Sequence, residues 1–375
     1  MIAQGMKEIV RGGWTALLRA APPKVSLEWV GLSLRSRPLG GDRQLLRDEA
    51  GYHNPPAAAI IGEPPNPPTS GYRSPAEYLI RLDGGYISKR SGVADRDGYT
   101  LREIACLTPH QREALDAYRA PLHLNRTRRL EGVTLALSTG QESNYFHWLF
   151  EVVCRYGMIE ALNEHIDHVY VESRFPFQQA SLRALGIDPR RIVSSHEASA
   201  VHCEAILAPS CLEAFWSPTD WMVEYLRQRF WKPAGSDAPH PKRIYITRQR
   251  SSYRRTRNEA QVIVLLEARG FEPVALEEHG LDAQAAIFRS AKVIVATHGA
   301  GLANLAFATP GAWVIELMPP RYCHWVYYNL AARAGCNYIC VMGEGATDPS
   351  LWGYQKEDIE VDPAKLREAL RVAGL

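Results

Sequence analysis

The sequence predicts an α/β protein made of two successive α/β units. Short apolar strands alternate with helical patterns from residue 131 onward, which is typical of parallel sheets with helices on their faces. A Pro-, Gly- and Ser-rich stretch at 233–242 divides this run in two. At 375 residues the chain is also longer than a single core comfortably supports. We therefore expect two lobes.

These patterns define four segments. Residues 1–130 are expected to form an N-terminal extension that is partly irregular, because the stretch 52–75 is rich in Pro and lacks helical periodicity. Asp-Gly pairs within 77–101 indicate β-hairpins in the same extension. The remaining segments are the first α/β unit at 131–232, a linker at 233–242 and the second α/β unit at 243–375.

In the first unit we expect four strands and three helices. Ser217 is the expected N-cap of the third helix, with Pro218 in the first helical position. The expected strands are 133–139, 168–173, 191–195 and 205–210, and the expected helices are 144–162, 176–187 and one from 218.

In the second unit we expect five strands and four helices. Asn258 is the expected N-cap of the first helix, and Asp362-Pro363 begins the last. The expected strands are 243–248, 271–277, 292–297, 313–318 and 336–342, and the expected helices are 259–270, 282–291, 324–335 and one from 363.

The composition limits the class of protein. Hydrophobic residues make up 46% and charged residues 22%, as in ordinary globular domains, and the net charge of +2 argues against a surface that coats nucleic acid. The seven cysteines contain no C-x-x-C pair, which favours reduced thiols over disulfides or a zinc site. The N-terminus lacks the pattern of a signal peptide, so we expect a cytoplasmic protein. Its first helix is expected to be packed or frayed, with peripheral contact to the inner face of the membrane as the alternative.

A glycine-rich turn follows the apolar strand 292–297. The chain continues there as His298, Gly299, Ala300 and Gly301, and then as a short helix. Glycines let backbone approach a phosphate, and the N-terminus of a helix attracts anions. The next strand brings Glu316 to the same edge, where a carboxylate can accept hydrogen bonds from a ribose. The alternative is a tight structural turn with a buried histidine and a surface carboxylate, and spacing alone does not decide between them.

A dinucleotide-binding motif is a weaker interpretation of this turn. The stretch "GAGLAN" has Asn304 where that motif has its third glycine. Pro310 leaves room for only a short helix, and the turn lies late in the chain. These departures disfavour a nicotinamide enzyme.

A basic loop follows the first strand of the second unit. Arg248 comes directly after that strand, so it should project at the same edge as the glycine turn. Guanidinium groups bind diphosphates in a bidentate manner. A solvated basic loop is the alternative, as is a nucleic-acid patch, although no recognised module surrounds it. The basic residues of the loop are 242, 243, 248, 250, 254, 255 and 257, with no acidic residue between them.

A polar stripe occurs on the aromatic-rich helix 144–162. His147, Glu151 and Arg155 follow one another at a spacing of four. A carboxylate buried on such a helix has a raised pKa, which suits a general base that accepts a hydroxyl proton. The alternative is a structural Glu151–Arg155 ion pair beside a capping histidine.

Taken together, these segments resemble bacterial members of glycosyltransferase family 61. The resemblance rests on "NYFHWLFEVVCR", "RIYITR", "ATHGAGLANLAFATPGAWVIEL" and "YYNLAARAGCNYICV", in that order, and covers residues 130–345. It implies a GT-B fold, in which two Rossmann-like lobes face a central cleft. It also implies inverting sugar transfer from a nucleotide sugar, without a metal or another cofactor, and with UDP as the expected carrier.

The resemblance also implies roles for particular residues. His147 and Glu151 match the first-lobe motif, and one of them would be the catalytic base. His324 and Tyr327 are further candidates for the donor pocket, although an aromatic helix face is more often core. The donor-binding residues would be Arg248, His298, Gly299, Ala300, Gly301, Asn304 and Glu316.

Bacterial relatives indicate a glycan acceptor and a role in surface-polysaccharide biosynthesis. The alternative function is a non-catalytic scaffold or glycan-binding protein in a polysaccharide-assembly complex, which would use the basic loop to bind an acidic glycan. The sequence does not predict the sugar, the acceptor or the oligomeric state.

Overall fold

The structure is a computed structural model whose described part includes nearly all of the second unit. The expected N-terminal helix, Ser217 and most of the linker lie outside the described residues. The continuous described ranges are 127–162, 164–212, 218–231, 240–345 and 356–375, and shorter described segments lie between 36 and 104.

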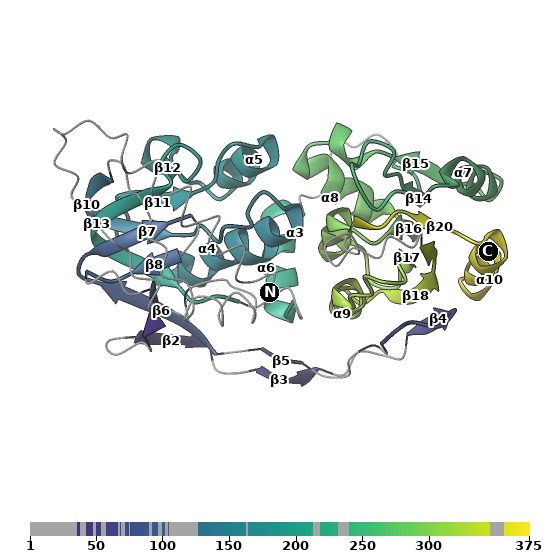
Figure 1. Cartoon of the computed structure of the whole chain (residues 1–375), viewed down its shortest axis with the longest axis horizontal. Coiled ribbons are helices and arrows are strands. Elements are labelled where there is room, and N and C mark those ends of the chain that lie inside the picture. The colour runs from purple at the N-terminus through teal and green to yellow at the C-terminus, as the bar shows by residue number, and fades with distance from the viewer. Residues whose placement is uncertain are drawn as a thin grey trace, which may run out of the picture.

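Two β-sheets lie side by side along the long axis of the molecule, and helices lie between them (Figure 1). The chain is thus a mixed α/β protein, as predicted. The first sheet has ten strands and the second has six. Among the described helices none is long and apolar enough to cross a membrane.

The first sheet combines a parallel half with antiparallel strands from the N-terminal segment. Its parallel strands lie in the order β13-β10-β11-β12. The chain runs from β10 through β11 to β12 and then returns to β13, which pairs with the other side of β10. Strands β6 and β7 pair with β13 in the antiparallel direction. The strands are β1 (Ser36–Arg37), β2 (Arg43–Arg47), β6 (Glu77–Leu82), β7 (Gly85–Ser88), β8 (Gly92–Ala94), β9 (Thr100–Leu101), β10 (Arg128–Ala136), β11 (His168–Val171), β12 (Ile192–Ser194) and β13 (Ala200–Pro209).

The second sheet is parallel throughout, in the order β15-β14-β16-β17-β18-β4. Its last strand, β4, comes from the N-terminal segment, which therefore contributes strands to both sheets. Figure 1 shows the antiparallel pair of β3 and β5 on the path between the two sheets. The strands are β3 (Ala50–His53), β4 (Ala59–Ile61), β5 (Tyr72–Ser74), β14 (Arg243–Ile246), β15 (Glu272–Val274), β16 (Val293–Thr297), β17 (Trp313–Met318), β18 (Asn337–Met342), β19 (Glu344–Gly345) and β20 (Ile359–Glu360).

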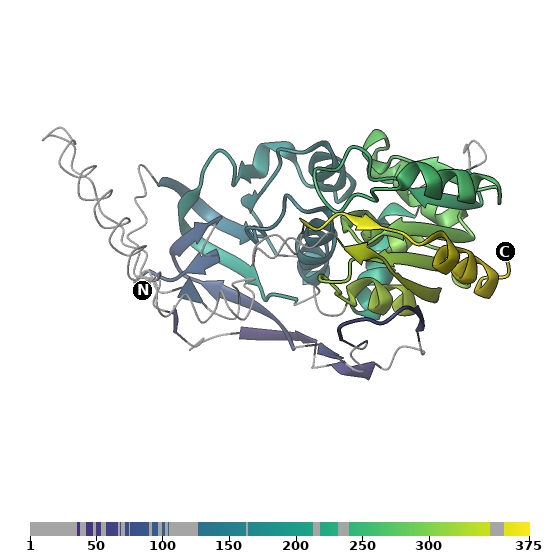
Figure 2. The same cartoon turned by 45° about the vertical axis from the view of Figure 1, so that its right-hand side comes forward.

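Helices bury both faces of the second sheet, which explains its continuous apolar strands. Along β16, Val293 and Val295 pack with the outer helices α7 and α10, whereas Ile294 and Ala296 pack with α8, η5 and α9. Figure 2 shows α7 and α10 on the outer face. The second-unit helices are α7 (Glu259–Glu267), η4 (Leu276–Glu278), α8 (Leu281–Ser290), η5 (Ala300–Phe307), α9 (Val326–Arg333) and α10 (Pro363–Val372).

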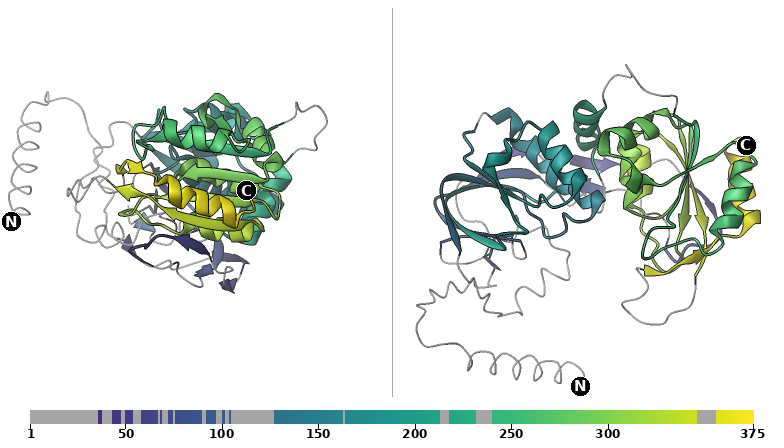
Figure 3. Two further views of the ribbon diagram at one scale, coloured as in Figure 1. Left: turned by 90° about the vertical axis from the view of Figure 1, so that its right-hand side faces the viewer. Right: turned by 90° about the horizontal axis from the view of Figure 1, so that it is seen from above.

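One apolar cluster continues from the inner helices of the second sheet into those of the first. The view from above in Figure 3 shows these two groups of helices facing each other. The elements that carry the two sets of predicted site residues therefore share a core. The first-unit helices are α3 (Tyr145–His147), η1 (Trp148–Val153), α4 (Cys154–Ile159), η2 (Glu160–Leu162), α5 (Pro176–Ala184), η3 (Pro189–Arg191) and α6 (Asp220–Phe230).

Some predicted elements differ in detail from the structure. Helix α6 begins at Asp220, because Thr219 is still extended, with φ −99° and ψ 164°; Pro218 thus precedes the helix. Asn258 is the N-cap residue of α7, but its side chain makes no capping bond and instead bonds both the N–H and the C=O of Val361. The expected helix 144–162 is one helical run whose central segment, η1, is a π-helix.

Candidate functional site

The carboxyl ends of β14 and β16 form the topological switch point of the second sheet. From β14 the chain passes to β15 on one side, and it then returns to β16 on the other. Ligands of open α/β sheets bind in the crevice at such a point. Arg248 follows β14, and the turn His298–Gly301 follows β16, so the two predicted motifs meet there.

The guanidinium of Arg248 lies directly against Gly299. A Cβ atom at Gly299 would collide with Nη1 of Arg248 and lie 3.0 Å from its Cζ. The φ of Gly299 is 173°, which any residue adopts, so space rather than backbone conformation requires the glycine. At Gly301 a Cβ would lie 2.8 Å from Cδ1 of Leu276. The glycines therefore allow Arg248 and η4 to approach the turn.

Arg254 joins Arg248 in this crevice. The Nε of Arg248 donates to the carbonyl of Arg254 at 3.0 Å, and its Nη2 donates to that of Tyr253 at 3.0 Å. Arg254 adopts a left-handed backbone conformation, with φ 52°, and only 8% of it is exposed. Its Cζ lies 5.2 Å from the ring centroid of Tyr322, and its buried Nε has no hydrogen-bond partner.

The two guanidinium groups place two positive charges close together, and Glu277 and Glu316 are near enough to act on them electrostatically. Burial lowers the pKa of Arg248, and the charge of Arg254 lowers it further, although arginine stays protonated at any working pH. In the described part of the chain neither arginine forms an ion pair. A buried site of this kind favours an anion.

Three other arginines of the basic loop, Arg250, Arg255 and Arg257, point outward. Arg255 pairs with Asp358 at 2.9 Å, Arg257 pairs with Glu360 at 3.5 Å, and Arg250 pairs with Glu278. These side chains are substantially exposed, which agrees with the alternative of a solvated basic loop. The sequence left Arg254, Arg255 and Arg257 undecided between binding and a solvated loop, and the inward direction of Arg254 depends on a φ value that the sequence does not reveal.

His298 and Glu316 form a buried pair behind the turn. Nδ1 of His298 and Oε1 of Glu316 share a hydrogen bond of 2.5 Å, and the hydroxyl of Tyr338 donates to Oε2 of Glu316 at 2.5 Å. Burial lowers the pKa of His298 well below its ordinary value, with added effects from Arg254 and Arg248. Burial also raises the pKa of Glu316 to about 8.

This geometry differs from the expected contact between Glu316 and a ribose. Glu316 is 0% exposed, and both its oxygens are engaged by His298 and Tyr338. The carboxyl group therefore holds the ring of His298 in place. His298 itself is 3% exposed and lies buried at the switch point, behind the glycine turn.

Asn304 is also placed differently from expectation. It is 0% exposed inside η5, and its Nδ2 donates to Oε1 of Gln284 at 2.8 Å and to the carbonyl of Gly301 at 3.1 Å. Its Oδ1 accepts from the hydroxyl of Tyr145 at 2.8 Å. Its hydrogen-bonding groups thus face protein, whereas Ala300 and Gly301 are partly exposed.

His147 and Glu151 lie together on the helical run of the first unit. Nδ1 of His147 lies 2.9 Å from Oε2 of Glu151, although without the alignment of a hydrogen bond. Both side chains are buried. The N–H of Cys154 donates to the carbonyl of Leu149, five residues earlier, which is the bond that defines a π-helix. Such π-turns are frequent at functional sites.

Arg155 does not pair with Glu151, so the ion pair expected in the structural alternative was wrong. Arg155 is 1% exposed and donates to three backbone carbonyls at the carboxyl ends of β10 and β13. The π-turn places an extra residue in the helical turn that separates Glu151 from Arg155. A spacing of four residues therefore does not bring these two side chains together, as it would in an α-helix. The carbonyls belong to Ala136, Leu137 and Pro209, at 3.2, 3.1 and 2.6 Å.

The start of α9 lies between the histidines of the two units. The ring of Tyr327 contacts His298 at a centroid distance of 5.0 Å and Phe146 at 5.9 Å. Burial lowers the pKa of His324 to about 4, and both His298 and His147 contribute to this shift. Tyr327 is buried and His324 is half-buried, so the predicted motifs of both units meet around these two residues.

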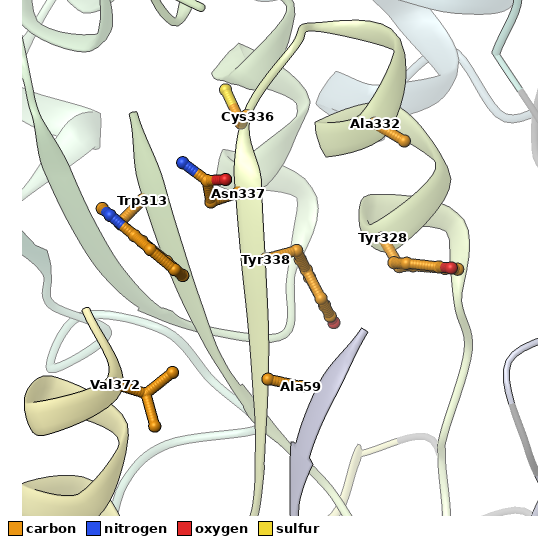
Figure 4. Close-up of a pocket in the computed structure, with 8 residues that line it drawn as sticks. All are labelled: Ala59, Trp313, Tyr328, Ala332, Cys336, Asn337, Tyr338 and Val372. Atoms are coloured by element: carbon orange, nitrogen blue, oxygen red, sulfur yellow. The ribbon is translucent and has the colours of Figure 1, made fainter. Parts of the chain in front are cut away.

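Two hollows in the surface lie outside this cluster. One of about 160 Å³, drawn in Figure 4, is lined by Trp313 and Asn337, the first residues of β17 and β18. It therefore lies at the amino ends of the strands, away from the switch point. Another, of about 320 Å³, lies beside the carboxyl ends of β11 and β12 and has Gln179, Arg183 and Glu197 in its lining. The residues that the structure describes contain no group of three His, Cys, Asp or Glu side chains that could hold a metal ion.

Comparison with known families identifies this region. Residues 145–315 match the model of the family described as Glycosyltransferase 61. This part of the chain belongs to glycosyltransferase family 61. The match covers a little under half of the chain and contains the predicted catalytic and donor-binding residues except Glu316, which directly follows its last residue; the further candidates His324 and Tyr327 also lie beyond it. No curated protein matches the chain.

The family match confirms the resemblance found in the sequence. It supports glycosyltransferase activity as the class of reaction. It also begins at Tyr145 and thus joins the π-helical motif of the first unit and the glycine turn of the second in one family domain.

Proposed function

We propose that the protein is an inverting glycosyltransferase of GT-B type that transfers a sugar from a nucleotide sugar to a hydroxyl of a glycan. The diphosphate of the donor would bind at the switch point between β14 and β16. The observation that carries this proposal is the half-buried Arg248 and the buried Arg254 beside Gly299, neither of which forms an ion pair within the described residues. Two adjacent positive charges in a crevice favour an anionic ligand, which would offset their repulsion.

The diphosphate would contact the turn in two ways. Arg248 presents its guanidinium across Gly299, and the first N–H groups of η5 have no partners within the helix. Together they bind an anion without an added metal. As the bond between sugar and diphosphate breaks, these donors stabilise the negative charge of the leaving nucleotide.

His298 would line this site as an uncharged side chain. Its lowered pKa keeps the ring uncharged, and Glu316 fixes its orientation from behind. The ring lies at the end of β16, where the chain enters the turn. It therefore orients the donor by contact rather than by charge.

The proton acceptor would be the pair of His147 and Glu151. Oε2 of Glu151 faces Nδ1 of His147, which turns Nε2 of the ring away from the carboxylate. A carboxylate in this position orients the imidazole and stabilises its protonated form. We assign Nε2 of His147 as the atom that takes the proton and Glu151 as its orienting partner.

The reaction would then proceed as an in-line displacement. The acceptor hydroxyl loses its proton to His147 while its oxygen attacks the anomeric carbon. The bond from that carbon to the diphosphate oxygen breaks on the opposite side, so the configuration inverts. The nucleotide diphosphate leaves with its charge held by Arg248 and Arg254.

The acceptor would approach from the first sheet. The hollow beside β11 and β12 has amide, guanidinium and carboxylate groups in its lining, which suit the hydroxyls of a glycan. We further propose that the reaction belongs to surface-polysaccharide biosynthesis on the cytoplasmic side, with UDP as the nucleotide, as the resemblance to bacterial members implies.

A nucleotide-release assay with UDP-, GDP-, CMP- and TDP-sugars tests this proposal. We expect release with one nucleotide class, and a Glu151→Gln variant that loses about 100-fold or more in turnover while binding the nucleoside diphosphate normally. A His147→Asn variant should lose at least as much. Absence of release and of thermal stabilisation with every donor would instead favour the non-catalytic scaffold, and full activity of Glu151→Gln would remove Glu151 from the site.

A further inference from the structure

The hydroxyl of Tyr145 links the helical run of the first unit to the glycine turn of the second. Tyr145 is the first residue of α3 and lies two residues before His147. Its hydroxyl donates to Oδ1 of Asn304 at 2.8 Å, and Asn304 lies three residues after Gly301 in η5. This single bond therefore joins the element with the proposed base to the element with the proposed diphosphate site.

Asn304 is held firmly on the side of the second unit. Its Nδ2 donates to Gln284 and to the carbonyl of Gly301, so the asparagine fixes the first turn of η5 directly. Gln284 is fixed in turn, because its Nε2 donates to the carbonyls of Leu276 and His279, each at 2.9 Å. A displacement of Asn304 would thus disturb the turn that faces the donor.

Tyr145 is held equally well on the side of the first unit. The N-cap residue Asn144 accepts from the N–H of Phe146 at 2.9 Å, which fixes the start of α3. The ring of Tyr145 packs edge-on against Phe177 at a centroid distance of 5.4 Å. Burial raises the pKa of Tyr145 far above its ordinary value, so the hydroxyl keeps the proton that it donates.

A separate contact keeps the two units together when this bond is absent. Arg227 of α6 donates to the carbonyls of Ala306, Ala308 and Ala334, at 2.8, 2.7 and 3.1 Å, and so holds the far end of η5. Removal of the Tyr145 hydroxyl would therefore release α3 from η5 at this point without separating the units, and Asn304 would keep its bonds to Gln284 and Gly301.

We propose that Tyr145 is a positioning residue that sets the distance between the proposed base and the donor site through its hydrogen bond to Asn304. This inference rests on the proposed function. Because transfer requires the acceptor oxygen and the anomeric carbon in close alignment, a small displacement between the two elements lowers the rate of the chemical step. Donor binding depends on groups of the second unit alone and should not change.

The test compares Tyr145→Phe with Tyr170→Phe in the full chain. Tyr170 is a matched control, because its hydroxyl donates to the carbonyl of Ala198 at 2.7 Å within the first unit. We expect Tyr145→Phe to lower kcat about 10-fold while KM for the donor and the Kd of the nucleoside diphosphate stay within about 2-fold. Tyr170→Phe should lose comparable thermal stability with kcat unchanged.

A double-mutant cycle with Asn304→Ala tests the route of the effect. In that background Tyr145→Phe should cause no further loss of kcat, because the bond is already absent. The inference is overturned if Tyr145→Phe leaves kcat unchanged, if it raises only KM for the donor, or if Tyr170→Phe lowers kcat equally. These outcomes all require an active wild-type protein, so they differ from failure of the proposed function, in which the wild type transfers no sugar.

Discussion

An arginine side chain reaches the switch point of each sheet, but the two arginines have different surroundings. In the first sheet Arg155 reaches the carboxyl ends of β10 and β13, where three backbone carbonyls accept its hydrogen bonds and it is 1% exposed. In the second sheet Arg248 reaches the carboxyl ends of β14 and β16, where it is half-buried and lies against Gly299.

The difference lies in what surrounds each guanidinium. Strand-end carbonyls engage Arg155 and close the crevice of the first sheet. Two loop carbonyls accept from Nε and Nη2 of Arg248, but its Nη1 lies against Gly299, and the neighbouring groups include a second guanidinium and the start of a helix, which favour negative charge rather than supply it. Topology thus offers two similar crevices, and local partners make one of them structural and the other a candidate ligand site.

Among the variants that test this comparison, the replacement of Arg155 should have the largest effect on stability. We expect Arg155→Ala to lower the free energy of unfolding by about 4 kcal/mol or more, because it leaves three buried carbonyls without donors. Arg248→Ala, as the matched control, should cost less than about 1 kcal/mol. Urea unfolding of both variants measures this, and equal losses would mean that the two arginines have the same role.

The pair of His298 and Glu316 predicts a pH dependence that the first switch point lacks. The pKa of Glu316 is raised from 4.5 to about 8, so the folded state keeps a proton there that the unfolded state loses above pH 4.5. The pKa of His298 is lowered from 6.5, so the unfolded state holds the extra proton below pH 6.5. The two contributions offset each other up to about pH 6.5, and above it only that of Glu316 remains.

The free energy of unfolding should therefore fall between pH 6.5 and 8, by about 1.4 kcal/mol per pH unit at most and about 2 kcal/mol in all. Glu316→Gln, whose amide stays neutral, should lack this fall. Denaturant unfolding of both proteins across pH 5 to 8.5 measures the difference. Parallel curves for the variant and the wild type would show that Glu316 is already ionised at neutral pH.

The close approach of Arg248 to the turn can be tested with two glycines. Gly299→Ala should weaken binding of a nucleoside diphosphate about 10-fold, because the new methyl group displaces the guanidinium. Gly280→Ala is the matched control, because a Cβ at Gly280 would meet nothing within 4 Å. Calorimetric titration compares them, and an unchanged affinity in Gly299→Ala would place the nucleotide elsewhere.

The strands and the meeting of Arg248 with the glycine turn were predictable from the sequence. Apolar runs identify buried parallel strands, and chain order then places the residues after β14 and β16 at one edge. The family resemblance, now confirmed, added the link to His147 and Glu151. The predicted roles of these side chains stay predictions.

Other features depend on three-dimensional contacts that no local pattern encodes. Glu316 faces inward because Tyr338, from the neighbouring strand, and His298 are both within reach of its carboxyl group. The side chain of Asn304 bonds to Tyr145, 159 residues earlier in the chain, and does not face the proposed ligand site. Arg254 points inward because of a left-handed φ that is uncommon for arginine.

The most direct test of the central claim is calorimetric titration of a nucleoside diphosphate into three arginine variants. Arg248→Ala and Arg254→Ala should each weaken binding by about 2 kcal/mol, or roughly 30-fold, since each loses a charge-assisted contact. Arg255→Ala should stay within about 2-fold of the wild type, because Arg255 is exposed and pairs with Asp358. Equal losses in all three variants, or an unchanged affinity in Arg254→Ala, would contradict a diphosphate site at the second switch point.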